Sequence, residues 1–429
     1  MLNELPASSG PGISGIPTKI LKTTSIMLIP ILKRLFNDCI TSNKIPAEWK
    51  SAIVTPIYKQ KGSIEDLNNF RGISVISPIA KLFEKILASQ IVEYINKERI
   101  LFNGQHGFRR NHSCETALHE LLSDMNTIRS NREIGVFLFV DFRKAFDLVD
   151  SRLLLHKLKM YGFNENTIKL LTNYFTDRTQ MVKFDNFIST SQPIKLSVPQ
   201  GSVLGPLFFL LFINDLPKYV KSAQCKMFAD DTTLYNSNKN SEALKISFDN
   251  ALKELNEWCQ FNRVDINWSK TYCMFINKTR NFVIPKFVTF EEKKIETVES
   301  FKLLGITIDN KLCFAKQSSE IRNNVNKRLY SIKKIFYLPY SVKIQFFKTF
   351  LLPYFDYCST LIIYFSKDAI QKLANTYNQC LYKLLNVKHA IEVSNDYNIL
   401  NNKLEKVRLA NYQHRVINQL TICIQDIKQ

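Results

Sequence analysis

Two adjacent aspartates, Asp230 and Asp231, lie between two short apolar stretches in the segment CKMFADDTTLY. The apolar stretches predict two strands joined by a turn, and Asp suits a turn because its side chain can bond its own backbone. Taken alone, the pair is explained by that structural role. A third carboxylate, Asp141, follows the apolar run GVFLFV and ends a second predicted strand.

Asp141 and Asp230 can meet at one rim of a sheet if both strands belong to that sheet. Carboxylates a few ångströms apart repel each other, and proteins seldom tolerate this without a compensating charge. Mg²⁺ suits such a site because it prefers oxygen and is usually held by one or two carboxylates plus substrate phosphates. Two such ions can stabilise both the attacking and the leaving oxygen of an in-line phosphoryl transfer.

The chain carries 58 Lys and Arg against 38 Asp and Glu, which is a formal net charge of +20. An excess of this size favours a polyanionic partner, either nucleic acid or an anionic membrane surface, although a solvated basic surface is the plain alternative. Together with the carboxylates, the charge indicates a nucleotidyl transferase that acts on nucleic acid. The chain has 429 residues, which is enough for two or three domains. Of these residues, 45% are hydrophobic, so the chain can bury a large core.

The cysteines and the apolar runs exclude further classes of protein. The nine cysteines are odd in number and form no C-x-x-C pair, which argues against a disulfide framework or a structural zinc site and favours a reducing compartment. The segments TTSIMLIPILKRLF and PLFFLLFINDL are shorter than the roughly 20 residues that span a bilayer. Both therefore predict buried helices, and no membrane partner is expected.

The elements that must position the carboxylates follow from hydrophobic patterns. GVFLFVDF does not alternate, so it predicts a strand buried on both faces, whereas RTQMVKFDNFIS alternates like an exposed strand. Helices are predicted in AKLFEKILASQIVEYI, in SRLLLHKLKMYG as far as Gly162, and in SEALKISFDNALKELNEWCQFN. The chain is helical in pattern from about residue 315. This order indicates an α+β core with helical appendages.

Five motifs occur in order along the chain: VDFRKAFDLVD, VPQGSVLGPLFF, FADD, INWSKT and FKLLGI. Their order and spacing resemble those of reverse transcriptases, in particular the jockey-like non-LTR retrotransposons. The upstream segments IPAEWKSAIVTPIYKQKG, NNFRGISV and QHGFRRNHSCETAL resemble the fingers of that family, and YSIKKIFYLPYSVKIQFFKTFLLPYFDYCS resembles its thumb. FADD alone is a weak signal, whereas five ordered motifs are a strong one.

The resemblance implies an α+β right-hand polymerase with fingers, a palm built on an antiparallel sheet, and a helical thumb. The expected ranges are 1–130 for the fingers and N-terminal extension, 131–310 for the palm with part of the fingers inserted, and 311–429 for the thumb and C-terminal segment. It also implies an RNA template, a DNA primer and dNTPs as partners, two Mg²⁺ ions, and a nuclear or cytoplasmic ribonucleoprotein location.

The same resemblance gives roles to single residues. Asp141, Asp230 and Asp231 would hold the metal ions while the primer 3′-hydroxyl attacks the α-phosphate and pyrophosphate leaves. Phe146 takes the place of an aromatic that packs under the sugar and excludes a 2′-hydroxyl. The alternative for Phe146 is a core aromatic in the strand-to-helix turn.

Further residues are expected to bind the nucleotide. Gln200 and Gly201 would contact it, because Gly allows close approach of the backbone and the Gln amide can bond sugar or base. Lys59 and Arg71 resemble the cations of the fingers that grip the triphosphate. Lys270 resembles the lysine proposed to protonate leaving pyrophosphate. A plain turn and exposed, solvated cations are the respective alternatives.

Two other functions stay open at this point. The chain could be a decayed or domesticated copy that binds RNA without polymerising, or a maturase-like splicing factor. The presence of every expected carboxylate favours the polymerase, and little chain follows the thumb motif for a maturase domain. The abrupt start in SSGPGISGIP predicts that the sequence is part of a longer protein.

Overall fold

The computed structural model describes residues 1–194, 201–278, 282–334, 337–385, 412 and 415–421. The chain divides into two compact units, each assembled from separate segments. Unit 1 comprises Met1–Arg110, Phe139–Leu234 and Ser247–Thr271. Unit 2 comprises Asn111–Leu138, Tyr235–Ile246 and Tyr272–Gln429. The three consecutive ranges implied by the resemblance stay a prediction.

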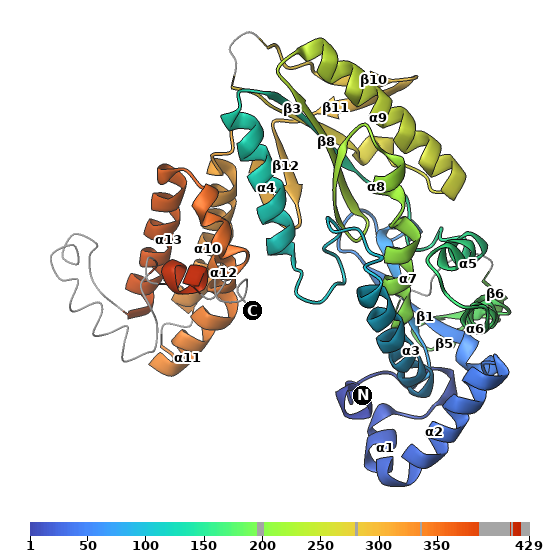
Figure 1. The fold of residues 1–429 in the computed structure, drawn as a ribbon. Coiled ribbons are helices and arrows are strands. Elements are labelled where there is room, and N and C mark those ends of the chain that lie inside the picture. Colours follow the sequence, from blue (N-terminus) through green and yellow to red (C-terminus); the bar gives the residue numbers. More distant parts are fainter. Residues whose placement is uncertain (195–200, 279–281, 335–336, 386–411, 413–414, 422–429) are drawn as a thin grey trace. The chain divides into compact units, whose positions relative to one another are not determined.

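One sheet carries the predicted carboxylates on neighbouring strands. Its order is β10-β11-β9-β3-β8-β7 (Figure 1). Every residue of β3 (Ile134–Val140) is buried, which confirms the prediction made from its non-alternating sequence. β7 (Gln224–Phe228) and β8 (Asp231–Asn238) are the two strands predicted in CKMFADDTTLY. The remaining members are β9 (Tyr272–Ile276), β10 (Phe287–Phe290) and β11 (Lys293–Thr297).

A second sheet lies within unit 1, in the order β2-β1-β4-β5, with β6 (Gln192–Pro193) paired to β4. β1 (Ser51–Tyr58) pairs antiparallel with β2 (Phe70–Val75) and parallel with β4 (Thr179–Phe184). The segment RTQMVKFDNFIS, predicted as one strand, is instead a hairpin, because Asp185 adopts a positive φ of 51° and turns the chain into β5 (Phe187–Ile188).

Unit 1 also contains helices. They are α1 (Thr18–Thr23), α2 (Ser25–Ser42), α3 (Pro78–Lys97), α5 (Ser151–Met160), α6 (Glu165–Phe175), α7 (Leu204–Ile213) and α8 (Leu216–Tyr219). α9 (Ser241–Asn262) matches the amphipathic helix predicted from its sequence, and α5 ends just before Gly162 as expected. In α7 every residue except Pro206 is buried, and α7 lies beside α3 (Figure 1).

The prediction that TTSIMLIPILKRLF forms a buried helix is wrong for its first turns. The segment lies in α2, but Ile26 and Met27 are 89% and 77% exposed. Only Leu32, Phe36 and Cys39 are buried, which is one narrow stripe at helical spacing. The described part of the chain holds no helix with the length and apolar character needed to cross a bilayer.

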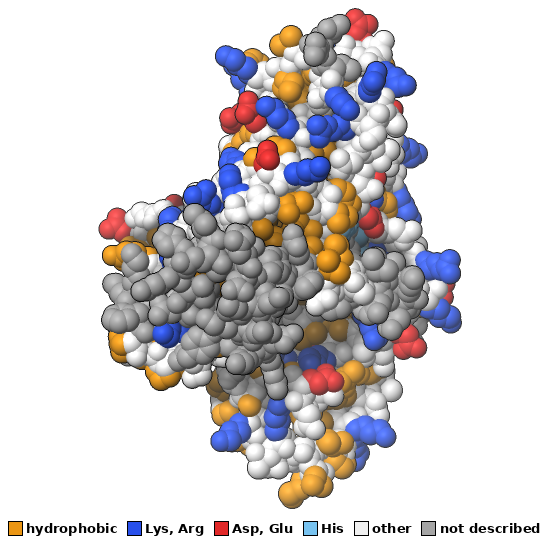
Figure 2. Space-filling view, turned by 90° about the vertical axis from the view of Figure 1, so that its left-hand side faces the viewer, with side chains coloured by type: hydrophobic (Ala, Val, Ile, Leu, Met, Phe, Trp, Pro, Cys, Tyr) orange, Lys and Arg blue, Asp and Glu red, His pale blue; other side chains and the backbone are white. Residues whose placement is uncertain are grey.

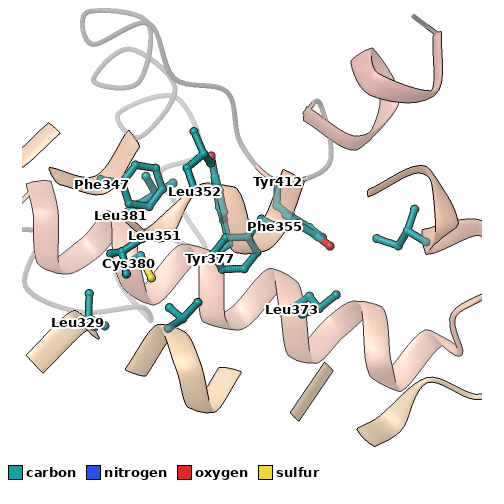
Figure 3. Close-up of a cluster of buried hydrophobic side chains, with 12 residues drawn as sticks. Leu329, Phe347, Leu351, Leu352, Phe355, Leu373, Tyr377, Cys380, Leu381 and Tyr412 are labelled. Carbon is teal, nitrogen blue, oxygen red and sulfur yellow. The ribbon is translucent and has the colours of Figure 1, made fainter. Parts of the chain in front are cut away.

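Unit 2 has a helical core of its own. Its elements include α4 (Cys114–Ser130), α10 (Ala315–Lys334), α11 (Tyr340–Phe346), α12 (Pro353–Asp356), α13 (Lys367–Leu385) and the hairpin of β12 (Ser300–Leu303) and β13 (Ile306–Asp309). Figure 3 shows the aromatic residues Phe347, Phe355, Tyr377 and Tyr412 among aliphatic side chains. The rings of Phe355 and Tyr377 are perpendicular, with centroids 5.1 Å apart. In the predicted thumb segment Phe347, Leu351, Leu352 and Phe355 pack inward, whereas other large side chains of the segment are exposed, among them Tyr330, Tyr337 and Phe350.

Candidate active site

The three predicted aspartates come together in unit 1. Asp141 follows β3 directly, Asp230 lies in the turn between β7 and β8, and Asp231 is the first residue of β8. The side chains of Asp141 and Asp230 are half-buried, and that of Asp231 is exposed. The negative charge of Asp141 acts on both Asp230 and Asp231, so the three carboxylates share one local electrostatic field.

That field disfavours negative charge. Burial raises the pKa of Asp230 and repulsion from Asp141 adds to the rise, while a backbone hydrogen bond and the positive charge of Arg71 oppose it. Partial desolvation raises the pKa of Asp231, and repulsion from Asp230 and Asp141 adds to this rise. Water screens part of the repulsion, since Asp231 is exposed. A cation bound among the three side chains would relieve the remaining repulsion.

Asp141 is held by the segment that contains INWSKT. The Asn267 side-chain amide donates to Asp141 Oδ2 at 2.9 Å, and the Asn267 backbone N–H donates to the Asp141 carbonyl at 2.8 Å. The backbone N–H of Asp141 donates to Thr271 Oγ1 at 3.3 Å. Sequence reasoning chose Lys270 from this motif and missed Asn267, although an amide three residues earlier is a natural partner for a carboxylate.

Lys270 itself is not brought into the cluster. It ends a short 3₁₀ helix (Trp268–Lys270), and its side chain is exposed. Within the described residues, no ion pair joins Lys270 to Asp141, Asp230 or Asp231. Its role in protonating pyrophosphate stays a prediction.

The turn that presents Asp230 is fixed by Gln105, another residue that sequence reasoning missed. Ala229 adopts a positive φ of 56° in this turn. Its N–H donates to Gln105 Oε1 at 2.9 Å, and Gln105 Nε2 donates back to its carbonyl at 3.3 Å. The same Gln105 Oε1 accepts from the Gly107 N–H at 2.8 Å. A polar residue that is only 2% exposed thus sets the backbone beside the carboxylates. The only signal in the sequence was its place in QHGF.

We expect Gln105→Leu to lower the free energy of unfolding by about 2 kcal/mol, because the buried N–H groups of Ala229 and Gly107 lose their acceptor. Urea denaturation followed by fluorescence measures the change. Gln260→Leu, at an exposed position of α9, is the matched control and should leave stability nearly unchanged. Equal stability of the two variants would show that Gln105 does not hold the turn.

The two predicted cations of the fingers differ in their placement. Arg71 lies in β2 opposite Ile57 of β1, and it is close enough for its charge to lower the pKa of Asp230. Lys59 follows β1, and its Nζ donates to the Asn68 carbonyl at 2.9 Å, within its own hairpin loop. The structure therefore brings Arg71 toward the carboxylates and ties Lys59 to local backbone.

Phe146 is half-buried and braced by two other rings. It stacks on Phe209 of α7 with ring centroids 4.4 Å apart and an interplanar angle of 26°. Phe108 meets it edge-on, with centroids 6.4 Å apart. Phe209 was not selected from the sequence, because it is one of many aromatics in an unbroken apolar run. The contacts leave Phe146 stiffly held, as a residue that shapes a nucleotide site must be.

Gly201 has a backbone conformation that other residues rarely adopt. Its φ is 111°, and a Cβ built on it would lie 2.4 Å from the Ser74 carbonyl oxygen. Ser74 belongs to β2, the strand that carries Arg71. Gly201 therefore packs directly against β2. Its predicted neighbour Gln200 lies outside the described residues.

We expect Gly201→Ala to lower the free energy of unfolding by about 2 kcal/mol more than Gly15→Ala does. Both glycines have positive φ, but nothing lies within 4 Å of a Cβ at Gly15. The difference between the variants therefore reports the clash with Ser74 together with the greater backbone strain of a Cβ at φ 111° than at φ 68°. Thermal unfolding of the two variants is the measurement, and identical losses would mean that the close approach to Ser74 carries no cost.

The three carboxylates suit a hard divalent cation in their chemistry, although they do not form a ready cage. Among the described residues, no group of three or more His, Cys, Asp or Glu side chains is arranged to hold a metal ion. Mg²⁺ rarely needs such a cage, because it keeps several waters and takes one or two carboxylates together with substrate phosphates. Oxygen donors with mutual repulsion are consistent with that mode of binding.

Comparison with known proteins places this site in a family. The family model described as "Reverse transcriptase (RNA-dependent DNA polymerase)" matches residues 57–308, a range that contains every site residue predicted from the sequence. The chain belongs to the reverse transcriptase family, and the predicted α+β, right-hand polymerase fold is confirmed. The sheet predicted to be antiparallel is mixed, because β11 pairs parallel with β9.

Relatives from mobile elements show which reverse transcriptases this chain is similar to. The chain is 26% identical over 365 residues to "RNA-directed DNA polymerase from mobile element jockey" of Drosophila melanogaster, covering 82% of this chain and 39% of that protein. It is 30% identical over 360 residues to "Probable RNA-directed DNA polymerase from transposon X-element" of the same species, with the same coverage of 82% and 39%. For "Probable RNA-directed DNA polymerase from transposon BS" the identity is 29% over 342 residues, which cover 77% and 37%. The predicted resemblance to jockey-like elements is confirmed.

The chain spans about two fifths of the length of these relatives, 37% to 39%. Among solved structures, one similar chain is apo telomerase from Candida tropicalis, truncated from the C-terminal domain, with 13% identity and a TM-score of 0.42. That similarity covers 62% of this chain and 54% of the telomerase chain.

Proposed function

We propose that this chain is the RNA-directed DNA polymerase of a non-LTR retrotransposon. The observation that carries the proposal is the shared field of Asp141, Asp230 and Asp231 at the ends of neighbouring strands inside the matched reverse transcriptase domain. The relatives named for jockey, BS and X-element support the same activity. The reaction is nucleotidyl transfer from a dNTP to a primer 3′-hydroxyl.

Asp141, Asp230 and Asp231 would hold Mg²⁺, and we propose two ions. When bound, the ions supply positive charge that stabilises the oxygens of the transferring phosphoryl group. The protein has little covalent chemistry to perform in such a transfer, so its residues act by placement. Asn267 orients the Asp141 carboxylate, and Gln105 fixes the turn that presents Asp230.

The nucleotide would be bound by further groups of unit 1. Arg71, whose charge already reaches Asp230, would bind triphosphate oxygens bidentately. Phe146, stacked on Phe209, would pack under the sugar and exclude a 2′-hydroxyl. Gly201 would let the backbone approach the nucleotide closely. Lys59, Gln200 and Lys270 stay proposed as further substrate-binding or proton-donating groups.

An RNA template and a DNA primer are the proposed partners. The net charge of +20 supports a polyanion, and Lys and Arg side chains are more numerous than Asp and Glu on the face shown in Figure 2. In unit 2, α10 carries basic residues along a helix whose apolar side packs inward. Such helices bind nucleic acid through phosphate contacts, which makes the affinity depend on salt.

A primer-extension assay tests the proposal. The purified chain is supplied with an RNA template annealed to a labelled DNA primer, four dNTPs and Mg²⁺, with EDTA added in a parallel reaction. We expect extension that depends on template and Mg²⁺ and stops in EDTA. Tight RNA binding without extension under any divalent cation would instead support a decayed or domesticated RNA-binding copy.

A further inference from the structure

Glu84 is a buried acid of α3 that the proposed mechanism does not use. It is 2% exposed, yet its carboxyl group is well supplied with donors. The Tyr174 hydroxyl donates to Glu84 Oε1 at 2.8 Å, and the Val203 backbone N–H donates to Glu84 Oε2 at 2.7 Å. The backbone N–H of Leu204 donates to the same carboxyl group.

These two backbone donors belong to the start of α7. Val203 is the N-cap residue of α7 and makes no side-chain cap, and the Ser202 hydroxyl before it accepts from the Gly205 N–H, at 2.9 Å. The first N–H groups of a helix need outside acceptors, and a carboxylate is favoured there by the positive end of the helix dipole. Glu84 therefore caps α7 from the neighbouring helix α3, which lies beside it (Figure 1).

Arg178 supports the Glu84 and Tyr174 pair from behind. Arg178 is 2% exposed, and its guanidinium lies over the Tyr174 ring at 4.6 Å from the centroid. Its Nη1 donates to the Tyr174 carbonyl at 3.1 Å, and its charge acts favourably on Glu84. Burying an acid, a phenol and a guanidinium together is costly unless they are held in one arrangement. The cluster of Glu84, Tyr174 and Arg178 thus supports the start of α7, with only Nη1 of the Arg178 guanidinium hydrogen-bonded, because its buried Nε and Nη2 have no hydrogen-bond partner among the described residues.

Site groups lie on either side of the first turn of α7. Gly201 lies two residues before Val203 and packs on the Ser74 carbonyl. Phe209, further along α7, stacks on Phe146. A shift of the first turn of α7 would therefore move the backbone at Gly201 and loosen the ring under Phe146.

We propose that Glu84 is a positioning residue for the incoming nucleotide, which it serves by capping α7 and holding Gly201 and Phe146 in place. The inference rests on the proposed polymerase function. It predicts that loss of the cap weakens nucleotide binding more than it slows the chemical step.

The test compares two substitutions at Glu84 in primer extension on the RNA template. Glu84→Met keeps the length of the side chain but leaves the N–H groups of Val203 and Leu204 without an acceptor, and we expect KM for dNTP to rise about tenfold with kcat within about threefold of the wild type. Glu84→Gln retains an oxygen that can accept from those N–H groups, so its KM should return to within about threefold. Glu93→Met, at an exposed position of α3, is the control and should behave as wild type.

The outcomes separate this inference from the proposed function. A wild-type chain that fails to extend the primer contradicts the polymerase itself. A wild-type chain that extends, beside a folded Glu84→Met variant with unchanged KM, overturns only the role of Glu84. If Glu84→Met does not fold, Glu84→Asp, with its carboxyl group drawn back by one methylene, replaces it. A raised KM then supports the role, and an unchanged KM refutes it.

Discussion

Replacing Asp230 by Asn is expected to reduce primer extension by at least about 10³-fold, because an amide cannot supply the negative charge that would hold the Mg²⁺ ion against the triphosphate. The fold should survive, since the pKa of Asp230 is raised mainly by burial. A raised carboxylate pKa means that the folded state disfavours the ionised form. The contribution of Asp230 to the free energy of unfolding is therefore most favourable at low pH, where its side chain is protonated. That contribution is lost as the pH rises through the raised pKa. Removing the charge at neutral pH should leave the melting temperature unchanged or slightly higher.

The measurement is the extension rate of the variant with RNA template, primer and Mg²⁺, taken together with its affinity for RNA and its melting temperature. Asp185→Asn makes the same chemical change in an exposed turn of unit 1, where Asn tolerates the positive φ of 51°. It should retain full activity. Full activity of Asp230→Asn would remove this carboxylate from the reaction and, with it, the proposed mechanism.

The second large effect concerns the choice of sugar. Phe146→Val is expected to admit ribonucleotides, lowering the preference for dNTP over rNTP by about 10²-fold. The physical reason is space, because Val lacks the ring that would lie under the nucleotide sugar and meet a 2′-hydroxyl. The comparison of kcat/KM for dNTP and rNTP, rather than either value alone, measures this preference.

Phe261→Val serves as the control for Phe146→Val. Phe261 is 68% exposed on α9, so its truncation should leave sugar preference unaltered. If Phe146→Val keeps the wild-type ratio of kcat/KM values, Phe146 is a packing residue of the turn and has no part in sugar selection. The stacking on Phe209 would then be its whole role.

Sequence patterns predicted the main elements around the site because burial follows periodicity. The uniform apolar run of β3, the hairpin of β7 and β8, and the amphipathic α9 all appear as expected. The first turns of α2 do not, since an apolar run says what could be buried and not whether a neighbour is present to bury it. Ile26 and Met27 show that difference.

Side-chain partners were harder to predict than elements. Gln105, Asn267 and Glu84 each fix backbone or a carboxylate across more than 100 residues of sequence, with separations of 124, 126 and 119. Nothing in a local pattern distinguishes such a residue from an ordinary polar side chain. Arg71 and Lys59 were both predicted from a sequence motif alone. In the structure the charge of Arg71 acts on Asp230, whereas Lys59 binds a backbone carbonyl of its own loop.

The interleaving of the two units in the sequence has consequences for the synthesis and the proteolysis of the chain. The polypeptide passes between them after residues 110, 138, 234, 246 and 271. No single proteolytic nick can release either unit as a continuous fragment, and the ribosome must synthesise residue 271 before the last segment of unit 1 exists. Expression of shortened pieces should therefore yield insoluble product wherever an end falls inside 111–271.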